Sequence, residues 1–598
     1  MNKNVPTQIA KDWTRLPKRD IREWLRAPSK INTLPFKDQL ALVLEAKGQD
    51  RQNLILSSNK SRELVQAIPE EELFFTIKEI GEADALELIT LTSPRQMEYI
   101  FDVEFWLKDK FRAQEALKWF RLLQKCGEEK IFETLQHMSL DILVVFLKKY
   151  IRVYKLEEEE GIEAYKNFFT LDNFYYLDFK YKKFGRTELE NLIKIMRDID
   201  PDLYMRVMES LYWEIDAEIE EEAFRFRCAR MADKGFPDLE EAQILYQFIE
   251  PDRYRSYKPT KNEADFELQG KRWQSIIPSH YFDLRDEKTF FNRVILANIG
   301  QEHFDRLMGE MVSISNKVLI ADAVDLSNLE WVSETLKKAS GYINIGLEYL
   351  AHKDVQRGME IVSHWYLEDI FRVGFSLLLK LRKKAHAIKM SERFFPGDDG
   401  WCLLVSPYSD IIEGLVERHP LLYEGMIDPK SVEYRPFRNL REVNNIDKLL
   451  DKILFWGELH FSVYGFQLGD IRRLDFSRCY PSNISHVDFT MLSLTALANQ
   501  VLHGEFKFSP IKRDRLNIFL STIFKKGKRT PLHIKTTVKN SCYRWLQSLL
   551  KGKGRREFFY AKEFWDSCFN LLEEEYGNLD FKKPVDPKFT KGLLIDLG

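Results

Sequence analysis

The sequence predicts a mainly α-helical, multi-helical protein with α-solenoid-like segments and a small mixed region in its C-terminal half. Glycine and proline account for only 27 and 21 of the 598 residues. Both shares lie below the usual values of about 7% and about 5%, which disfavours a turn-rich all-β protein. Short amphipathic segments also follow one another closely from Pro35 onward. A chain of this length is expected to form several domains.

Charge, hydropathy and cysteine spacing exclude several classes of protein. The 90 Lys and Arg residues nearly balance the 93 Asp and Glu residues, which excludes a wholly basic nucleic-acid coat and a highly acidic disordered protein. No run approaches 18 uninterrupted apolar residues, and the polar start lacks a secretory signal. The six cysteines are scattered without a Cys-x-x-Cys pair, so we expect neither a disulfide framework nor a metal ribbon. A cytoplasmic protein without a membrane span is the expectation.

Residues 36–155 are expected to form a short-helix repeat domain that follows an N-terminal arm, residues 1–35. Pro69 with the three glutamates after it suits a helix start. Further starts at Glu82 and at Pro94, the latter with Ser93 as its N-cap, follow at spacings of 13 and 12 residues. Helices of about 11 residues are unstable alone, so several must stack, as in a solenoid. The pattern resembles the short-helix superhelix at the cytoplasmic start of bacterial magnesium transporters and in flagellar switch proteins.

The rest of the chain divides at segments rich in proline, glycine or charge. The acidic run Glu157–Glu160 is typical of a solvated helix face. Residues 341–350, followed by residues 355–362, are similar to one tetratricopeptide-type helix–turn–helix. Partial alternation over residues 459–466 favours a short strand. The expected segments are a helical domain at 156–250, a linker or irregular segment at 251–300, a helical domain with the tetratricopeptide-like hairpin at 301–395, a mixed α(+β) region at 396–510 and a basic helical C-terminal region at 511–598.

Six phrases of the sequence together carry a family resemblance. They are Glu72–Gly81, Asp102–Trp106, Gly235–Pro237, Phe371–Phe375, Tyr434–Arg438 and Leu494–Ala498. They resemble a bacterial family catalogued as a domain of unknown function, number 6178, over roughly residues 35–520. The resemblance implies a bacterial, cytoplasmic, largely helical protein. It implies no catalytic residue, cofactor or substrate.

Motifs of common enzyme chemistry are missing. Glycine–lysine pairs occur three times, but Ser or Thr follows none of them, so there is no phosphate-binding P-loop. Ser376 lacks the second glycine of a nucleophile elbow and is expected to pack within a helix. The 11 histidines show no zinc-binding spacing. We therefore predict no catalytic residue, no cofactor and no metal. An enzyme whose site is assembled from distant residues stays open.

Two polar clusters have a functional and a structural interpretation. His486 and Asp488 are candidates for metal ligands, or for a base with its orienting carboxylate. The structural alternative is a capped loop that leads into the helix of residues 492–502. Asp398 and Asp399, between two glycines, would offer oxygen atoms to magnesium or form a tight turn. We favour the structural interpretation of both clusters.

The strongest charge signal lies near the C-terminus. Twelve Lys and Arg residues and no Asp or Glu occur between Arg515 and Arg556. Tyr543, Trp545 and Phe559 lie in or beside this stretch, and such interleaving is typical of surfaces that bind nucleic acid. Contact with the chain's own acidic segments, an acidic partner or anionic lipid are the alternatives. The candidate nucleic-acid or anion-binding residues are Lys525, Lys526, Lys528, Arg529, Lys535, Arg544, Lys551, Lys553, Arg555 and Arg556.

Taken together, these features favour a helical protein-interaction scaffold with an unknown protein partner. Stacked short helices present extended surfaces, and no catalytic motif stands beside them. A nucleic-acid-associated factor that uses residues 515–556 is the first alternative. An enzyme with a site that one sequence does not reveal is the second.

Overall fold

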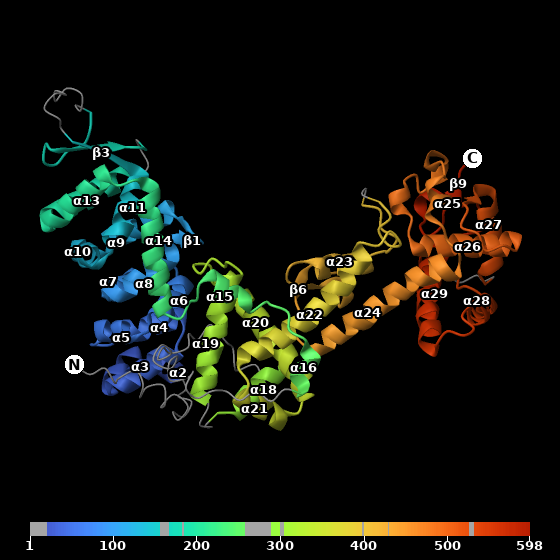
Figure 1. Cartoon of the computed structure of the whole chain (residues 1–598), viewed down its shortest axis with the longest axis horizontal. Helices are drawn as coiled ribbons and strands as arrows, with labels where there is room; N and C mark the ends of the chain where they lie inside the picture. Colours follow the sequence, from blue (N-terminus) through green and yellow to red (C-terminus); the bar gives the residue numbers. More distant parts are fainter. Residues whose placement is uncertain are drawn as a thin grey trace. The chain divides into compact units, whose positions relative to one another are not determined.

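The computed structural model describes residues 21–155, 167–181, 185–256, 289–299, 304–397, 400–428, 430–525 and 531–598. The chain separates into two compact units, residues 1–373 and 374–598, and the boundary falls within helix α22 (Leu367–Lys389). Helices dominate both units, which confirms the predicted mainly α-helical class (Figure 1). Within the described ranges, no helix combines the length and the apolarity needed to cross a lipid bilayer.

Short helices follow one another along the first part of the N-terminal unit (Figure 1). The N-cap predicted at Ser93 is confirmed, because its side chain accepts a hydrogen bond from the Gln96 N–H at 3.3 Å. The helix expected at Glu82 begins instead at Leu86, since residues 82–84 form a turn. The elements are α2 (Ile21–Arg26), η1 (Pro28–Thr33), α3 (Phe36–Glu45), α4 (Gly48–Leu56), α5 (Ser61–Ala67), α6 (Glu70–Ile80), α7 (Leu86–Leu91), α8 (Pro94–Glu104), β1 (Trp106–Leu107), β2 (Lys110–Phe111), α9 (Ala113–Cys126), α10 (Glu128–His137) and α11 (Leu140–Tyr150).

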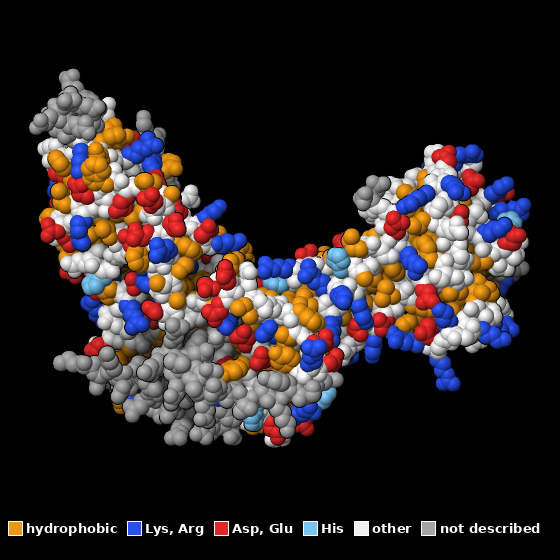
Figure 2. All heavy atoms as spheres, viewed as in Figure 1, with side chains coloured by type: hydrophobic (Ala, Val, Ile, Leu, Met, Phe, Trp, Pro, Cys, Tyr) orange, Lys and Arg blue, Asp and Glu red, His pale blue; other side chains and the backbone are white. Residues whose placement is uncertain are grey.

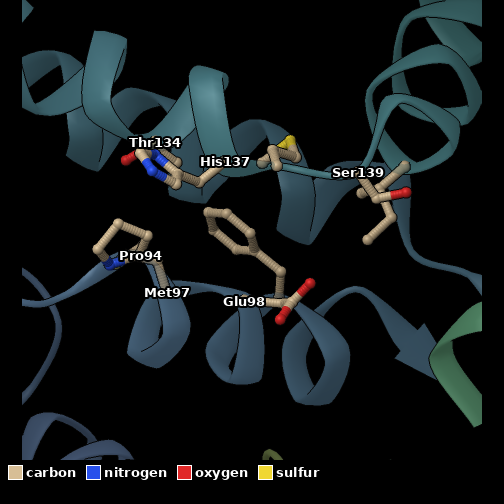
Figure 3. Close-up of a pocket in the computed structure, with 9 residues that line it drawn as sticks. Pro94, Met97, Glu98, Thr134, His137 and Ser139 are labelled. Carbon is tan, nitrogen blue, oxygen red and sulfur yellow. The ribbon is translucent and has the colours of Figure 1, made fainter. Parts of the chain in front are cut away.

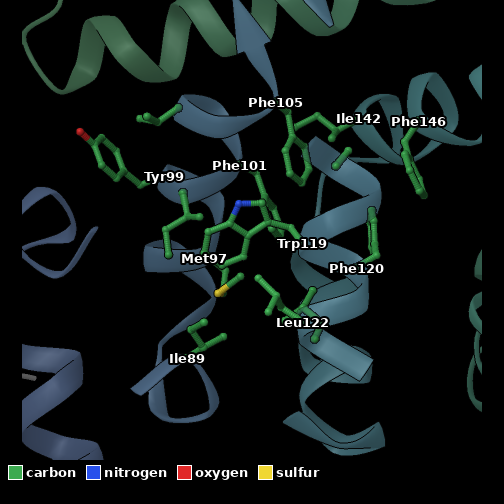
Figure 4. Close-up of a cluster of buried hydrophobic side chains, with 14 of the residues drawn as sticks. Ile89, Met97, Tyr99, Phe101, Phe105, Trp119, Phe120, Leu122, Ile142 and Phe146 are labelled. Carbon is green, nitrogen blue, oxygen red and sulfur yellow. The ribbon is translucent and has the colours of Figure 1, made fainter. Parts of the chain in front are cut away.

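A continuous hydrophobic core joins these short helices. The ring centroids of Phe101 and Phe120 lie 6.4 Å apart, and those of Phe120 and Phe146 lie 4.6 Å apart, so stacked rings link α8, α9 and α11 (Figure 4). Trp119 is fully buried in the same cluster. Each buried aromatic side chain contributes about 1.5–3 kcal/mol relative to an exposed one. The stack therefore supplies the stability that a helix of 6 to 14 residues lacks alone.

A buried ion pair fixes the first helices of the stack. The Arg51 side chain on α4 is fully buried, and its Nη2 atom lies 2.6 Å from Glu72 Oε1 on α6. The same guanidinium donates to three main-chain carbonyls and to the Thr76 hydroxyl at 2.6–3.0 Å. A buried charge is tolerated when it is both paired and hydrogen-bonded, as here. The pair therefore sets the spacing between α4 and α6.

The hairpin of β3 (Ile151–Lys155) and β4 (Tyr175–Phe179) follows the stack and is antiparallel. Helices α12 (Arg186–Ile199), α13 (Pro201–Trp213) and α14 (Asp216–Asp233) come next. Helix α13 packs on β3, and α14 lies along α11. Arg230 on α14 binds the Asp102 carboxylate of α8 through two hydrogen bonds of 2.6 and 2.8 Å. Helix α14 therefore ties the hairpin end of the stack to its middle. The acidic run Glu157–Glu160 lies outside the described residues.

Helices α18 (Phe290–Ala297), α19 (Phe304–Ala321) and α21 (Val355–His364) pack against α20 (Leu329–Ala351), and α15 (Leu239–Ile244) packs against α19. Helices α20 and α21 form the predicted helical hairpin. Gly358 on α21 allows close contact with α18, because a Cβ atom there would lie 2.7 Å from Val294 Cγ2. Most of the predicted linker, residues 257–288, lies outside the described part of the chain. The elements are α15 (Leu239–Ile244), α16 (Pro251–Ser256), α18 (Phe290–Ala297), α19 (Phe304–Ala321), α20 (Leu329–Ala351), α21 (Val355–His364) and the first residues of α22.

The C-terminal unit combines helices with short strands. Strand β9 is the middle strand of a small sheet, parallel to β8 and antiparallel to β7. The elements are α23 (Tyr408–Val416), β5 (Leu421–Tyr423), η3 (Glu424–Met426), β6 (Tyr434–Pro436), α24 (Leu440–Glu458), η4 (Leu459–Val463), α25 (Leu468–Arg472), η5 (Phe476–Arg478), β7 (Cys479–Tyr480), η6 (Ile484–His486), α26 (Phe489–His503), β8 (Ile511–Lys512), α27 (Arg513–Ile523), α28 (Thr536–Leu549), α29 (Arg555–Tyr576), η7 (Pro587–Phe589) and β9 (Ile595–Asp596).

The strand expected at residues 459–466 is wrong. Residues Leu459–Val463 form the π-helical turn η4, which continues α24. Adjacent residues Leu459 and His460 are both buried, whereas a strand would turn one of them to the opposite face. His460 tolerates burial because its Nδ1 atom hydrogen-bonds to the Trp456 carbonyl at 2.7 Å. The hydrogen bond of its ring thus allows the polar His460 to be buried beside Leu459, so the alternation of polar and apolar residues does not indicate a strand here.

Loss of the buried carboxylate at Glu72 should destabilise the N-terminal unit. We expect Glu72→Ala to lower its free energy of unfolding by about 3–5 kcal/mol, because the variant leaves the Arg51 charge buried without its partner. Urea denaturation of the full chain measures the change. Glu63→Ala, at an exposed position of α5, is the matched control and should stay within about 0.5 kcal/mol. A Glu72→Ala variant as stable as the parent would contradict this account of the pair.

Candidate functional site

The structure distributes the predicted basic residues over four places in the C-terminal unit. Lys525 lies after α27, Lys535 precedes α28, and Arg544 lies on α28. Lys551, Lys553, Arg555 and Arg556 lie in the turn between α28 and α29 and at the start of α29. Lys526, Lys528 and Arg529 are outside the described residues. The continuous run in the sequence is therefore not one continuous helix face.

Several of these cations bind groups of the chain itself. Lys553 pairs with Glu458, and Arg556 pairs with Asp451 on α24. The Lys535 ammonium donates to the Thr522 carbonyl at 2.6 Å. This arrangement is the one expected from contact with the chain's own acidic segments. Exposed ion pairs of this kind are weak and are screened by salt, so a stronger anion would compete for the same cations.

Other cations of the stretch form no ion pair within the described part of the chain. The side chains of Lys525, Arg544, Lys551 and Arg555 are exposed, and none forms an ion pair with any described residue. The unit around them is basic: residues 374–598 contain 36 Lys and Arg against 27 Asp and Glu, a net charge of +9. Residues 1–373 carry the opposite excess, a net charge of −12. A polyanion would therefore meet a favourable field at the C-terminal unit.

The aromatic residues of the same stretch are largely used inside the fold. Trp545 stacks on Tyr464 with ring centroids 5.5 Å apart, and the Tyr543 hydroxyl hydrogen-bonds to Asp566. Tyr560 is buried beneath the guanidinium of Arg556. Phe559, in contrast, is 54% exposed. The rings that the sequence offers for stacking on bases are thus mostly committed to core contacts.

A second surface, which we name the Lys155 cluster, lies at the hairpin end of the N-terminal unit. The Lys155 ammonium at the end of β3 is surrounded by four aromatic rings, with centroids 4.8 to 5.8 Å from Nζ. It also lies 2.8 Å from the Glu209 carboxylate of α13. Cation–π contact and the ion pair together hold the lysine in place. The cluster consists of Lys155, Phe174, Tyr175, Glu209, Tyr212 and Trp213.

Glu209 organises this cluster electrostatically. Hydrogen bonds from Lys155 and then from Tyr175 lower the pKa of the Glu209 carboxyl. The Trp213 indole N–H donates to the same carboxylate at 3.0 Å. Trp213 is nevertheless 70% exposed and Phe174 is 45% exposed. The cluster therefore presents large aromatic surfaces to solvent in fixed orientations (Figure 2 shows hydrophobic side chains gathered at this end of the unit).

Sequence reasoning missed the Lys155 cluster. Its members come from positions between 155 and 213, on β3, on β4 with the residue before it, and on α13. No local spacing connects them. The adjacent pair Tyr212-Trp213 at the end of a helix was the only signal in the sequence, and an aromatic pair at such a position is normally a core feature.

A small pocket opens between α8 and the turn that joins α10 to α11 (Figure 3). It encloses about 10 Å³, room for about one water molecule. The Ser139 hydroxyl donates to Asp141 at 3.2 Å, and His137 hydrogen-bonds to the Glu133 carbonyl at 2.9 Å, so no serine–histidine pair forms here. The lining residues are Pro94, Met97, Glu98, Phe101, Thr134, His137, Met138, Ser139 and Ile142. The pocket is too small for a substrate.

A serine–histidine hydrogen bond occurs in the C-terminal unit but is inaccessible. His460 Nε2 lies 2.8 Å from Ser493 Oγ, and the ring stacks on Phe489 at 4.1 Å between centroids. Both polar side chains are fully buried, and burial lowers the pKa of His460 to about 4. A nucleophile must reach its substrate, so we assign this pair to the core rather than to catalysis.

The structure resolves most of the remaining sequence candidates. Asp488 is the N-cap of α26 and accepts a hydrogen bond from the Met491 N–H at 2.8 Å, which confirms the capped-loop interpretation. His486 is exposed at the end of η6, and Ser376 is buried within α22, as predicted. Asp398 and Asp399 lie outside the described residues. Across the described ranges, no three His, Cys, Asp or Glu side chains group in a way that would hold a metal ion.

Comparison with known protein families shows which family the chain belongs to. The family of unknown function DUF6178 matches residues 28–596, almost the whole chain. The chain belongs to this family. The resemblance found in the six sequence phrases is thereby confirmed, and it extends through the basic C-terminal region, for which the sequence phrases gave no match. No curated protein and no solved structure matches the chain. Membership of DUF6178 therefore relates almost the whole chain to one family but indicates no activity.

The pKa of the N-cap Asp488 makes stability depend on pH. Burial raises this pKa to about 6, although main-chain hydrogen bonds from Met491 and Thr490 oppose the rise. The folded state then binds a proton more tightly than the unfolded state, so ionisation of Asp488 costs stability as pH rises from about 4 to above 6. Asparagine caps a helix equally well and carries no charge. We expect Asp488→Asn to be more stable than the parent at pH 7.5, by up to about 3 kcal/mol.

Thermal or urea unfolding at pH 4.5, 6 and 7.5 tests this expectation. The advantage of Asp488→Asn should shrink as the pH falls through about 6. Asp475, an exposed N-cap of η5 whose pKa is lowered by hydrogen bonds from Ser477, provides the matched control. Asp475→Asn should bring no gain at pH 7.5. An equally stable Asp488→Asn variant at pH 7.5 would contradict the assigned burial cost.

Proposed function

We propose that this DUF6178 protein is a helical scaffold that binds a protein partner. The Lys155 cluster carries the proposal, because it holds Trp213 in one orientation while leaving it 70% exposed. Aromatic side chains that are fixed before binding lose little conformational entropy on association. Tryptophan is also among the residues most enriched at the energetic centres of protein interfaces.

The surrounding architecture supports the same role. Most short helices of the stack bury one face and leave exposed residues on the other, although α11 has no exposed residue, so the stack presents an extended surface. Ile215, two residues after Trp213, and Tyr181, after β4, are also exposed. These apolar groups belong to the same end of the unit. Following the family resemblance, we place this scaffold in the bacterial cytoplasm.

Truncation of the exposed indole should remove the partner. We expect Trp213→Ala to reduce the amount of the main co-purifying protein at least tenfold, because loss of a central interface tryptophan typically costs 2 kcal/mol or more, roughly 30-fold in affinity. The fold should persist, since Trp213 is mostly exposed. Affinity purification of the tagged full chain from a bacterial host, after nuclease treatment, with quantitative mass spectrometry, measures the loss.

Trp331→Ala is the matched control for this experiment. Trp331 lies on α20 of the same unit and is 57% exposed, so the variant removes a similar surface elsewhere. It should recover the partner at the parent level. The scaffold proposal is wrong if no stoichiometric protein survives nuclease, or if Trp213→Ala and Trp331→Ala recover the same partner equally.

Binding of nucleic acid by the C-terminal unit is the second candidate function. The specific observation in its favour is a set of exposed cations that form no ion pair with any described residue, among them Arg544, Lys551 and Arg555, in a unit of net charge +9. Lysine and arginine that neutralise phosphates bind without sequence preference. The internal use of most neighbouring aromatic rings limits stacking on bases, which ranks this candidate below the scaffold.

Neutral substitution of these three cations should weaken any such binding. For the triple variant Arg544→Gln, Lys551→Gln and Arg555→Gln, the slope of log affinity against log salt should fall by about 2 with single-stranded DNA, roughly 0.7 per lost phosphate contact. Fluorescence anisotropy with a labelled 30-nucleotide strand measures the slope. The matched triple Lys30→Gln, Lys37→Gln and Lys47→Gln alters exposed lysines of the other unit and should leave the slope unchanged. Equal slopes for both triples would exclude the basic stretch.

A further inference from the structure

Among the described residues, strand β3 pairs with β4 on one side and with no strand on the other. On β4, the Leu177 N–H donates to the Phe169 carbonyl at 2.8 Å, and the Phe169 N–H donates to the Leu177 carbonyl at 3.1 Å. The main-chain groups of Leu177 therefore point away from β3. Because these groups alternate along a strand, Tyr176 and Asp178 are the β4 residues whose main-chain groups face β3.

The same alternation orients the main chain of β3. Arg152 and Tyr154 are opposite Asp178 and Tyr176 and face them, whereas Val153, opposite Leu177, turns its N–H and C=O to the outer side. The Lys180 N–H donates to the Tyr150 carbonyl at 2.8 Å, as expected if every second residue, from Tyr176 through Asp178 to Lys180, faces β3. Among the described residues, nothing hydrogen-bonds to the main chain of Val153 on this side. Such an edge is a template for one more strand.

The charges beside this edge indicate what kind of strand would fit. Arg152 and Lys180 are exposed, and neither pairs with an acidic group in the described chain. Burial lowers the pKa of Lys180, Asp216 raises it, and the charges of Arg152, Lys149 and Lys148 lower it further, so these cations lie near one another. Lys148 and Lys149 have partners, Asp216 and Glu220. Asp178, across from Arg152, forms no ion pair with any described residue.

We propose that the outer edge of β3 binds an extended acidic segment of a partner protein as an additional strand. The proposal rests on the scaffold function and names the chemistry of its partner. Val153 exchanges main-chain hydrogen bonds with the incoming segment, and an acidic side chain of that segment lies opposite Arg152, where opposite charges on neighbouring strands attract. The edge ends at Lys155, so the segment continues onto the exposed rings of the Lys155 cluster.

A designed peptide tests the edge directly. The probe is a fluorescein-labelled decapeptide of alternating glutamate and valine, titrated into the full chain and followed by anisotropy. We expect saturable binding, together with slower hydrogen exchange in the segment that contains Val153. The same peptide N-methylated at its six central amides cannot donate main-chain hydrogen bonds and should not bind. A lysine–valine version should also fail, because its charge is wrong for Arg152.

Charge reversal on the protein completes the test. Arg152→Glu should weaken binding of the glutamate–valine peptide about tenfold, and Lys37→Glu, at an exposed position of α3, should leave it unchanged. Absence of binding, equal binding of the N-methylated peptide, or equal affinity of Arg152→Glu would each overturn strand addition. Partner capture that still depends on Trp213 in those cases would leave the scaffold function standing. If the peptide binds as expected but partner capture does not depend on Trp213, the scaffold proposal is rejected instead.

Discussion

Burial of one face of every short helix against its neighbours is the constraint on which the N-terminal unit depends. Helices of 6 to 14 residues do not persist alone, since their few hydrogen bonds do not offset the entropy of ordering the chain. The stacked rings of Phe101, Phe120 and Phe146 join three of them into one core. The surface of the stack, and everything displayed on it, follows from this continuous core.

Charged groups within this unit play two different structural parts. At Arg51 and at Asp102, charges are buried, and full pairing with hydrogen bonds makes burial tolerable. At Lys155, the same kind of pairing occurs at the surface, where Glu209 binds the ammonium and the Trp213 indole together. The first two tie helices to one another. The third holds the exposed rings of Trp213 and Phe174 at the surface, which is why we associate it with binding.

The C-terminal unit divides a run of cations that is continuous in the sequence. Turning the chain back at the α28–α29 connection brings Lys553 and Arg556 against acids of α24, whereas Lys551 and Arg555 form no ion pair with a described residue. The excess positive charge of this unit is thus partly neutralised by its own helices. A long-range field remains, because the net charges of the two units have opposite sign.

The sequence by itself determined the class, the membership of DUF6178 and several local features, including the N-cap at Ser93, the α20–α21 hairpin and the capped loop at Asp488. These depend on neighbours within a few residues, so local spacing is enough to predict them. Tertiary structure decided the rest. The Lys155 cluster joins residues up to 58 positions apart, the edge of β3 depends on which groups of Leu177 pair with Phe169, and the turn at Leu459 depends on a buried histidine. Such contacts form only when distant segments pack together, so the spacing of residues along the chain does not predict them.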